Sequence, residues 1–348
     1  MAAPPYRSRT IRLIALGTVA GAVALAPFLL PGGGAGTPPA FTTAARLPLD
    51  GLAADLAADG SRLCIAAGRL HVVDIAVPAR PALRSSLDLV GMDLGGARGV
   101  AVQREFAFVA TQTTPDANPR NALRVLDLSD PDHPVVTGSV ATPGTLPEGR
   151  IPIVVEGTRV YLCRPALYVV EVDKPAAPRL LPAVPARALD LCVREGVVFL
   201  AAEAGGLLVL DLRDPAAPAT LAHWGNPDPE GNWFGARALS LAGERLLAAG
   251  THRGEPRLLV FEVADPSAPR LVVSCTLPGR SAYALEVDGA HALASVEGLG
   301  LAAFALSGHD APRLASRRPL PAARRLLRRD GVLYLAAWDR GLEVFLLR

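Results

Sequence analysis

The chain has 348 residues, of which half are hydrophobic and 20% are charged, and its formal net charge is +2. This balance permits a large buried core and excludes an extensively disordered protein. The small net charge also argues against a nucleic-acid binder, which normally carries a concentrated basic surface.

The first forty residues are predicted to be a targeting segment and a tether, separate from the fold. Several arginines precede an uncharged apolar run over residues 13–30, which is the layout of an export signal. Such a run is long for a signal peptide and just long enough for a membrane span, so a cleaved signal and a membrane anchor both stay open. We expect residues 1–40 to export the chain, and residues 41–348 to work in the periplasm, on the cell surface or in the medium.

A short hydrophobic segment recurs seven times after residue 40. Its copies are LHVVDI (70–75), LRVLDL (123–128), LYVVEV (167–172), LLVLDL (207–212), LLVFEV (258–263), LAAFAL (301–306) and LEVFLL (342–347). Two apolar stretches joined by a tight turn precede the segment, and in all but the last copy another stretch follows it. This spacing, with Gly and Pro between the stretches, predicts four short strands per unit.

Seven such units in series predict an all-β, seven-bladed β-propeller of four-stranded antiparallel blades. The last unit ends on its third strand. The segment AARLPLDG (44–51) resembles ASRRPLPA (315–322), which is the fourth strand of the sixth unit. We therefore expect the N-terminal strand to complete the last blade and to close a monomeric ring.

The recurring pattern resembles the LVIVD-repeat family of bacterial and archaeal β-propellers. Its best copies are VLDLSDPDHP (125–134), VLDLRDPAAP (209–218) and VFEVADPSAP (260–269), and the resemblance covers roughly residues 45–348. It implies the propeller fold and an exported protein, and it implies no catalytic residues.

The Asp-Pro turn that follows most copies is predicted to be scaffolding. Asp214 and its counterparts Asp130 and Asp265 can accept hydrogen bonds from backbone N–H groups just ahead of them, and the proline after each presets the turn. The alternative is a calcium site, which needs six or more oxygen ligands. The same position holds Val77 in one copy and Lys174 in another, so we expect no metal and no other cofactor.

One face of the propeller is predicted to carry function. The loops between units, and those between the second and third strands, vary in length, and loops on a rigid scaffold often bind ligands. The main candidate is the loop 223–237, whose candidate ligand-binding residues are His223, Trp224, Asn226, Asp228, Asn232, Trp233 and Phe234. Tryptophan beside Asn and Asp suits stacking on a sugar or anchoring a protein partner. The alternative is that the tryptophans pack between blades four and five.

A second set of candidates lies near the starts of the innermost strands, around the central channel. These are Arg98, Arg150, Arg187, Arg237, Arg280 and Arg324. A ring of guanidinium groups favours carboxylates, phosphates or acidic glycans. The idea requires at least three of the six to face one cavity.

Catalytic residues are not apparent. The nearest approach to an acid–base set is Asp190, Glu286 and His252, and for each the alternative is a solvated or salt-bridged structural role. The four cysteines form no C-x-x-C pair, so both buried thiols and a Cys163–Cys192 bridge stay open.

The expected function is therefore non-catalytic binding or scaffolding at the cell envelope. The partner would be an envelope glycan or a protein, and membrane contact would involve the N-terminal segment alone. The alternative is a propeller hydrolase or lyase that acts on an extracytoplasmic polysaccharide or lactone.

Overall fold

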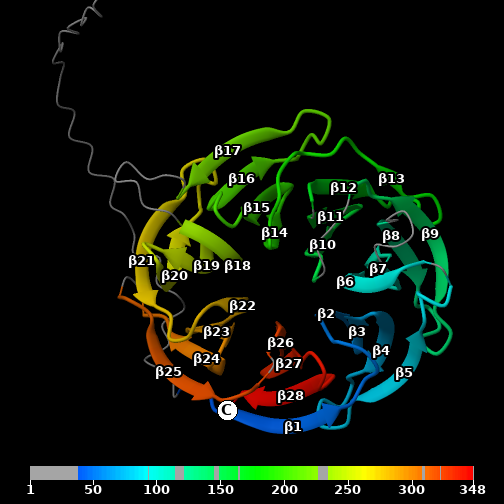
Figure 1. Ribbon diagram of the computed structural model, residues 1–348, viewed down its shortest axis with the longest axis horizontal. Coiled ribbons are helices and arrows are strands. Elements are labelled where there is room, and N and C mark those ends of the chain that lie inside the picture. Colours follow the sequence, from blue (N-terminus) through cyan, green and yellow to red (C-terminus); the bar gives the residue numbers. More distant parts are fainter. Residues whose placement is uncertain are drawn as a thin grey trace, which may run out of the picture.

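Seven four-stranded antiparallel sheets form a ring in the computed structural model of the protein (Figure 1). The structure describes residues 38–347 except 93, 114–120, 145–148, 164, 226–233, 308–309 and 322. Among these residues there is no helix, and hence none that could cross a membrane. The predicted export segment 13–30 lies outside them.

The first four blades run from the centre of the ring to its rim in chain order. Blade one contains β2 (Asp55–Asp59), β3 (Arg62–Ala67), β4 (Arg69–Asp74) and β5 (Ala82–Leu87). Blade two contains β6 (Gly96–Gln103), β7 (Phe106–Gln112), β8 (Ala122–Asp127) and β9 (Val135–Ala141). Blade three contains β10 (Ile153–Glu156), β11 (Arg159–Cys163), β12 (Leu167–Glu171) and β13 (Arg179–Leu180). Blade four contains β14 (Asp190–Arg194), β15 (Val197–Ala201), β16 (Leu207–Asp211) and β17 (Ala219–Trp224).

The last three blades complete the ring. Blade five contains β18 (Phe234–Ala242), β19 (Arg245–His252), β20 (Glu255–Glu262) and β21 (Arg270–Thr276). Blade six contains β22 (Ala282–Asp288), β23 (His291–Val296), β24 (Gly300–Ala305) and β25 (Arg313–Arg318). Blade seven contains β26 (Arg325–Arg329), β27 (Val332–Ala336), β28 (Leu342–Leu347) and β1 (Phe41–Leu47). Each recurring hydrophobic segment is the third strand of its blade, as the repeat predicts.

Blade seven combines strands from both ends of the described chain. β1 pairs antiparallel with β28, from Phe41 opposite Leu347 to Leu47 opposite Leu342, and the register shifts once between Thr43 and Ala45. Figure 1 shows β1, in blue, on the outer side of β28, in red. The strand begins three residues before the predicted segment 44–51 and ends within it.

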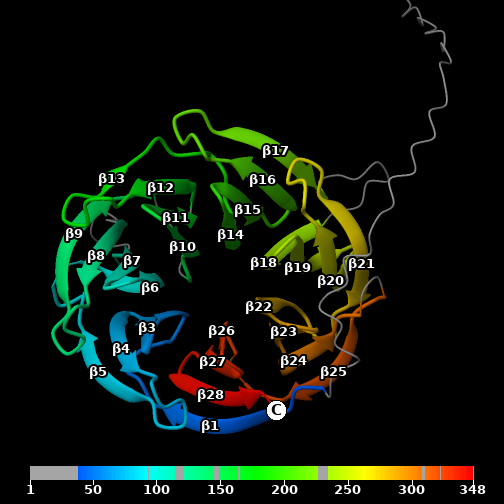
Figure 2. The ribbon, with the colours of Figure 1, turned by 180° about the vertical axis from the view of Figure 1, so that it is seen from behind.

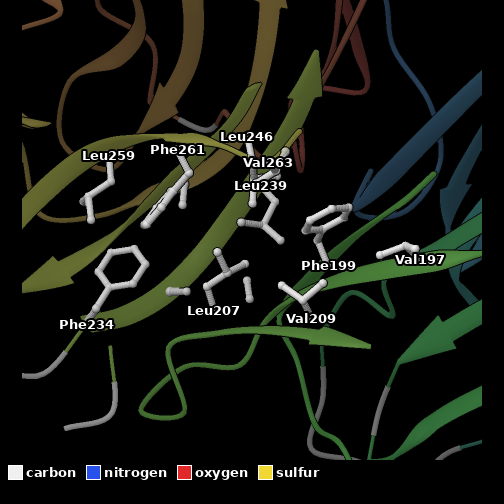
Figure 3. Packing of buried hydrophobic residues seen from close by; sticks show 13 residues of the cluster. Val197, Phe199, Leu207, Val209, Phe234, Leu239, Leu246, Leu259, Phe261 and Val263 are labelled. Carbon is white, nitrogen blue, oxygen red and sulfur yellow. The ribbon is translucent and has the colours of Figure 1, made fainter. Parts of the chain in front are cut away.

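The core consists of seven apolar clusters, each of which fills the interface between two neighbouring blades. Figure 3 shows the cluster between blades four and five, which contains Phe199, Phe234 and Phe261. Because both faces of a blade are covered, its middle strands are apolar on both sides; every residue of β15 is buried. This explains why the recurring segments are mostly hydrophobic and do not alternate strictly between apolar and polar residues.

The Asp-Pro turns are scaffolding in the structure. Asp214 accepts a hydrogen bond from the N–H of Ala216 at 2.9 Å, and the equivalent bonds form at Asp130 and Asp265. Where the aspartate is replaced, the turn keeps its backbone bond, as in the 2.8 Å contact from the N–H of Ala177 to the carbonyl of Lys174. The turn therefore depends on its backbone and its prolines, with the aspartate as an added support.

None of the four cysteines forms a disulfide, so the alternative bridge between Cys163 and Cys192 is absent. Cys163 donates from Sγ to the carbonyl of Ala186 at 3.3 Å. Burial raises the pKa of both Cys64 and Cys192 to about 12. These thiols pack as small hydrophobic side chains.

Candidate functional site

A cavity of about 300 Å³ opens at the centre of the ring, where the innermost strands begin. Figures 1 and 2 show these strands converging from all the blades around the axis. The cavity is lined by Ala54, Gly149, Arg150, Leu189, Arg237, Ala282, Tyr283, Arg324 and Trp338. These residues lie at the starts of innermost strands or in the β27–β28 connection. The cavity is therefore on the variable-loop face, and we call it the channel mouth.

Two of the lining side chains project from β-bulges. The register of β18 shifts between Ala236 and Ala238, which leaves Arg237 as the extra residue. The register of β22 shifts in the same way around Tyr283. A bulge re-aims a side chain out of the regular alternation. Both innermost strands thus turn one long polar side chain into the channel mouth.

Trp338 reaches the mouth from a constrained turn. Its φ angle is 52°, and it is the only aromatic residue with a positive φ in the part of the chain that the structure describes. Its backbone exchanges hydrogen bonds of 2.8 and 3.2 Å with Ala53 of blade one. Blades one and four make the same bridge through Gly68 and Glu203. A bulky residue at positive φ is a true outlier. The fold therefore holds the backbone of Trp338 in a conformation that glycine would adopt more easily.

The guanidinium of Arg324 is held between two aromatic rings. Its Cζ atom lies 4.4 Å from the centroid of Tyr283 and 4.6 Å from the centroid of Trp338. Cation–π contacts of this kind fix the position of a guanidinium and leave its N–H groups able to donate. Blades six and seven thus preorganise one arginine at the mouth.

A second charged layer lies one residue further along the innermost strands. Arg150 contacts Asp55 and Asp190, each at 3.0 Å, and Arg325 contacts the same carboxylates at 3.6 and 3.4 Å. Both aspartate side chains are at most 2% exposed. The two pairs span the channel from four different blades.

The aspartates of this layer also join neighbouring blades. Asp55 accepts a hydrogen bond from the N–H of Val100 at 3.1 Å, and Asp190 accepts one from Leu239 at 3.0 Å. Burial disfavours the charged guanidinium of Arg325, but Asp190 and Asp55 outweigh this cost and raise the pKa of Arg325 above its ordinary value. We call this layer of four ion pairs, formed by Asp55, Asp190, Arg150 and Arg325, the ionic cross-brace.

The mouth itself keeps an excess of positive charge. Across the part of the chain that the structure describes, no carboxylate lies within 4.0 Å of the guanidinium of Arg237 or of Arg324, although other arginines at the same face make such pairs. Arg237 is exposed. Two guanidinium groups therefore face a small cavity without a carboxylate partner among the described residues, which is the charge pattern of an anion site.

A third carboxyl group lies beside the cross-brace. Burial, opposed by Arg325 and reinforced by Asp190, raises the pKa of Glu286 from 4.5 to about 7. Arg328, which also faces it, is paired with Asp288 at 2.5 Å. Glu286 is therefore an acid whose charge changes near neutral pH.

The structure brings three of the six predicted arginines to one cavity: Arg150, Arg237 and Arg324. Arg187 pairs with Glu203 at 3.4 Å, and Arg280 is exposed outside the cavity lining. Their places in the lining are taken by Leu189 and Tyr283, which lie two and three residues later. The registers read from the sequence were therefore off by two residues at Arg187 and by three at Arg280.

Arg98 is also absent from the cavity lining, although it occupies a bulge in β6 that corresponds to the bulge at Arg237. Its carbonyl accepts a hydrogen bond from the N–H of Ile151 at 3.0 Å. A bulge thus brings an arginine into the lining of the channel mouth in blade five but not in blade two.

Of the residues predicted in the loop 223–237, two pack between blades, one is exposed, and the others lie outside the residues that the structure describes. Phe234 has no exposed surface, and Trp224 packs edge-on against it and against Phe261, with centroids 5.6 and 4.7 Å apart. Phe234 therefore presents no surface to a ligand in the structure, and Trp224 packs between blades four and five. His223 is exposed and bonds to the carbonyl of Gly205. Asn226, Asp228, Asn232 and Trp233 lie outside the described residues.

The acid–base candidates are not assembled as a catalytic set. Asp190 uses both carboxylate oxygens in the cross-brace. His252, which ends β19, packs near the rings of Trp224 and Phe234. Within the described ranges, no group of three His, Cys, Asp or Glu side chains could hold a metal ion. The salt-bridged alternative is correct for Asp190.

Comparison with known proteins identifies the repeat. The LVIVD repeat model matches residues 50–88, 94–142 and 186–222. The chain carries LVIVD repeats. The three matched segments fall in blades one, two and four. No curated protein matches the chain in sequence.

Solved structures share the propeller fold at low sequence identity. A chain of the mitotic checkpoint complex has a TM-score of 0.65 at 12% identity and covers 98% of both chains. BamB from Moraxella catarrhalis has a TM-score of 0.54 at 12% identity, over 84% of each chain. PorZ of Porphyromonas gingivalis has a TM-score of 0.57 at 16% identity, over 87% of this chain and 38% of its own. These LVIVD repeats thus build a fold with many distant counterparts.

Proposed function

We propose that the protein is a non-catalytic binding module of the cell envelope, which holds an acidic partner at the channel mouth. The observation that carries the proposal is the pair Arg237 and Arg324, which line one cavity and have no carboxylate within 4.0 Å in the part of the chain that the structure describes. The LVIVD-repeat propeller fits a binding or scaffolding role. Surrounding variable loops give a partner a wider contact area on the same face.

An extracytoplasmic location is part of this proposal. The basic and apolar N-terminal pattern around residues 13–30 is typical of export. PorZ, which shares the fold, is described as a bacterial surface component of a secretion system. Binding is favoured over hydrolysis because Asp55 and Asp190, in the layer directly beneath the mouth, are occupied by structural ion pairs.

A binding screen tests the proposal. The full chain, kept in detergent if it stays in the membrane, is presented with acidic and neutral glycans and with solubilised envelope proteins. The double variant Arg237→Gln and Arg324→Gln is compared with the double variant Arg187→Gln and Arg280→Gln, which removes the same charge from the same face. We expect acidic partners to be captured by the wild type and the control, and lost from the mouth variant.

Two results would overturn the proposal: capture that survives in the mouth variant, or capture of neutral ligands alone. Fractionation of cells that produce the full chain tests the location. We expect the protein outside the cytoplasm, and a purely cytosolic protein would contradict this part.

A further inference from the structure

The chemistry of the channel mouth narrows the ligand beyond an acidic partner. Resting on the proposed function, we propose that the mouth binds the carboxylate of a sugar-sized acid, with Arg324 and Arg237 as the groups that contact it. Three features of the mouth lead to this ligand: its charge balance, the fixed geometry of Arg324, and the size and walls of the cavity.

The charge at the mouth favours an acidic ligand. Asp55 and Asp190 pair with Arg150 and Arg325 in the layer beneath it. Among the residues that the structure describes, no carboxylate lies within 4.0 Å of the guanidinium of Arg237 or of Arg324, and both arginines line the cavity. A single carboxylate also brings less charge into a partly buried site than a dianion does, at a lower desolvation cost.

The geometry of Arg324 favours a planar oxyanion. Contacts at 4.4 and 4.6 Å with Tyr283 and Trp338 restrict the guanidinium to one orientation. A fixed guanidinium presents a planar fork of N–H donors, and a coplanar carboxylate can accept two parallel hydrogen bonds from it. The rings supply this order before the ligand arrives, so less conformational entropy is lost on binding.

The size and walls of the cavity favour a single sugar ring. Its volume of about 300 Å³ is at the lower end of the range for small-molecule sites. Small residues leave room inside the cavity at Ala54, Gly149 and Ala282, and apolar surface is provided by Leu189 and Trp338. Apolar and aromatic surface suits the C–H faces of a sugar, while the guanidinium groups take its acidic substituent. A folded domain or a polymer segment does not enter such a cavity, but the acidic end of a polymer does.

Calorimetric titration of the full chain tests the inference with defined probes. D-glucuronate is the carboxylate probe, D-glucose is its neutral counterpart, and glucose 6-phosphate carries the dianion on the same ring. A short oligouronide tests whether the carboxylate can come from a polymer end. We expect glucuronate to bind, glucose to give no measurable heat, and glucose 6-phosphate to bind at least 10-fold more weakly. Oligouronide binding would assign the ligand to a polymer end, and its failure to a free acid; both support the proposal.

Arg324→Lys is the decisive variant, because it keeps the charge and removes the planar fork. Loss of a charge-assisted bidentate contact should weaken glucuronate binding by about 10- to 100-fold. Arg237→Lys, a second variant away from the aromatic rings, should also weaken binding. Arg187→Gln and Arg280→Gln lie outside the cavity lining, so both should bind glucuronate like the wild type. Melting curves confirm that each variant is folded.

The outcomes separate this inference from the proposed function. Tighter binding of glucose 6-phosphate than of glucuronate, or equal binding by Arg324→Lys and wild type, would overturn the carboxylate assignment. Failure of every small probe would also overturn it. In each of these cases the proposed function still stands if the mouth variant loses its partners in the envelope screen, and it falls if that variant retains them.

Discussion

Replacing Glu286 by glutamine should change how the stability of the propeller depends on pH. The carboxyl group faces Arg325, Asp190 and Arg328, and burial raises its pKa from 4.5 to about 7. A carboxyl with a raised pKa in the folded state favours folding at low pH, and this contribution is lost as the pH rises through the folded pKa. The wild type should therefore lose stability relative to Glu286→Gln mainly between pH 4.5 and 7.

The magnitude follows from the size of the pKa change. At about 1.36 kcal/mol per pKa unit, a rise from 4.5 to about 7 corresponds to about 3 kcal/mol. At pH 4 the ionisation of Glu286 adds almost nothing to the difference in free energy of unfolding between wild type and Glu286→Gln. At pH 8 Glu286→Gln should be more stable relative to the wild type than at pH 4, by an amount on this order.

Urea denaturation at a series of pH values measures this difference. Slopes and midpoints are compared between wild type, Glu286→Gln and Glu244→Gln, which removes one exposed carboxylate from a turn of blade five. The reasoning is refuted if the difference between wild type and Glu286→Gln is flat from pH 4 to pH 8, or grows toward low pH.

Three further predictions concern the scaffold. Asp190→Ala should lower the free energy of unfolding by about 3 kcal/mol or more, since it leaves buried guanidinium charge uncompensated. Asp214→Ala, in an exposed turn, should lower it by about 1 kcal/mol or less. Equal losses of stability in denaturant melts would contradict a stabilising role of the cross-brace. Deleting residues 41–47 should expose the edge of blade seven, lower the melting temperature and promote association, and an unchanged melt and elution volume in size-exclusion chromatography would show that β1 is dispensable. The thiols of Cys64 and Cys192, whose pKa burial raises to about 12, should resist a thiol reagent at pH 8 until the protein is denatured; rapid reaction of the native protein would argue against their burial.

Much of the fold could be predicted from the sequence because the propeller repeats its own signals. Each third strand is mostly apolar, since both faces of a blade are covered, and in most blades a proline turn marks its end. The fourth strand was less regular: β13 has only two residues. Pro182 and Pro185 follow it and lack the N–H groups that a longer strand would need.

The site was only partly predictable. Arginine enrichment at the starts of the innermost strands was visible. The bulges that place Arg237 and Tyr283 at the mouth were not, because one-residue shifts of register leave little trace in the sequence. Trp338 was missed because it lies in a short turn with unremarkable neighbours. The equivalent positions in blades one and four hold Gly68 and Glu203. A tryptophan at a position where another repeat has glycine is a signal that could have identified Trp338.

Trp224 and Phe234 show the opposite error. Aromatic residues beside Asn, Asp and Gly resembled an exposed binding loop, but both rings pack in the interface between blades four and five. Loop composition alone does not distinguish a ring that leaves the blade from one that covers its end. The side chains that the structure brings to the mouth come mainly from strand starts.

A crystal structure of the protein with D-glucuronate would test the central claim most directly. The account predicts a carboxylate at the channel mouth, with its oxygens about 3 Å from guanidinium nitrogens of Arg324 and Arg237. Electron density for the sugar acid on the outer rim, or an empty mouth at a concentration where titration shows saturation, would contradict it.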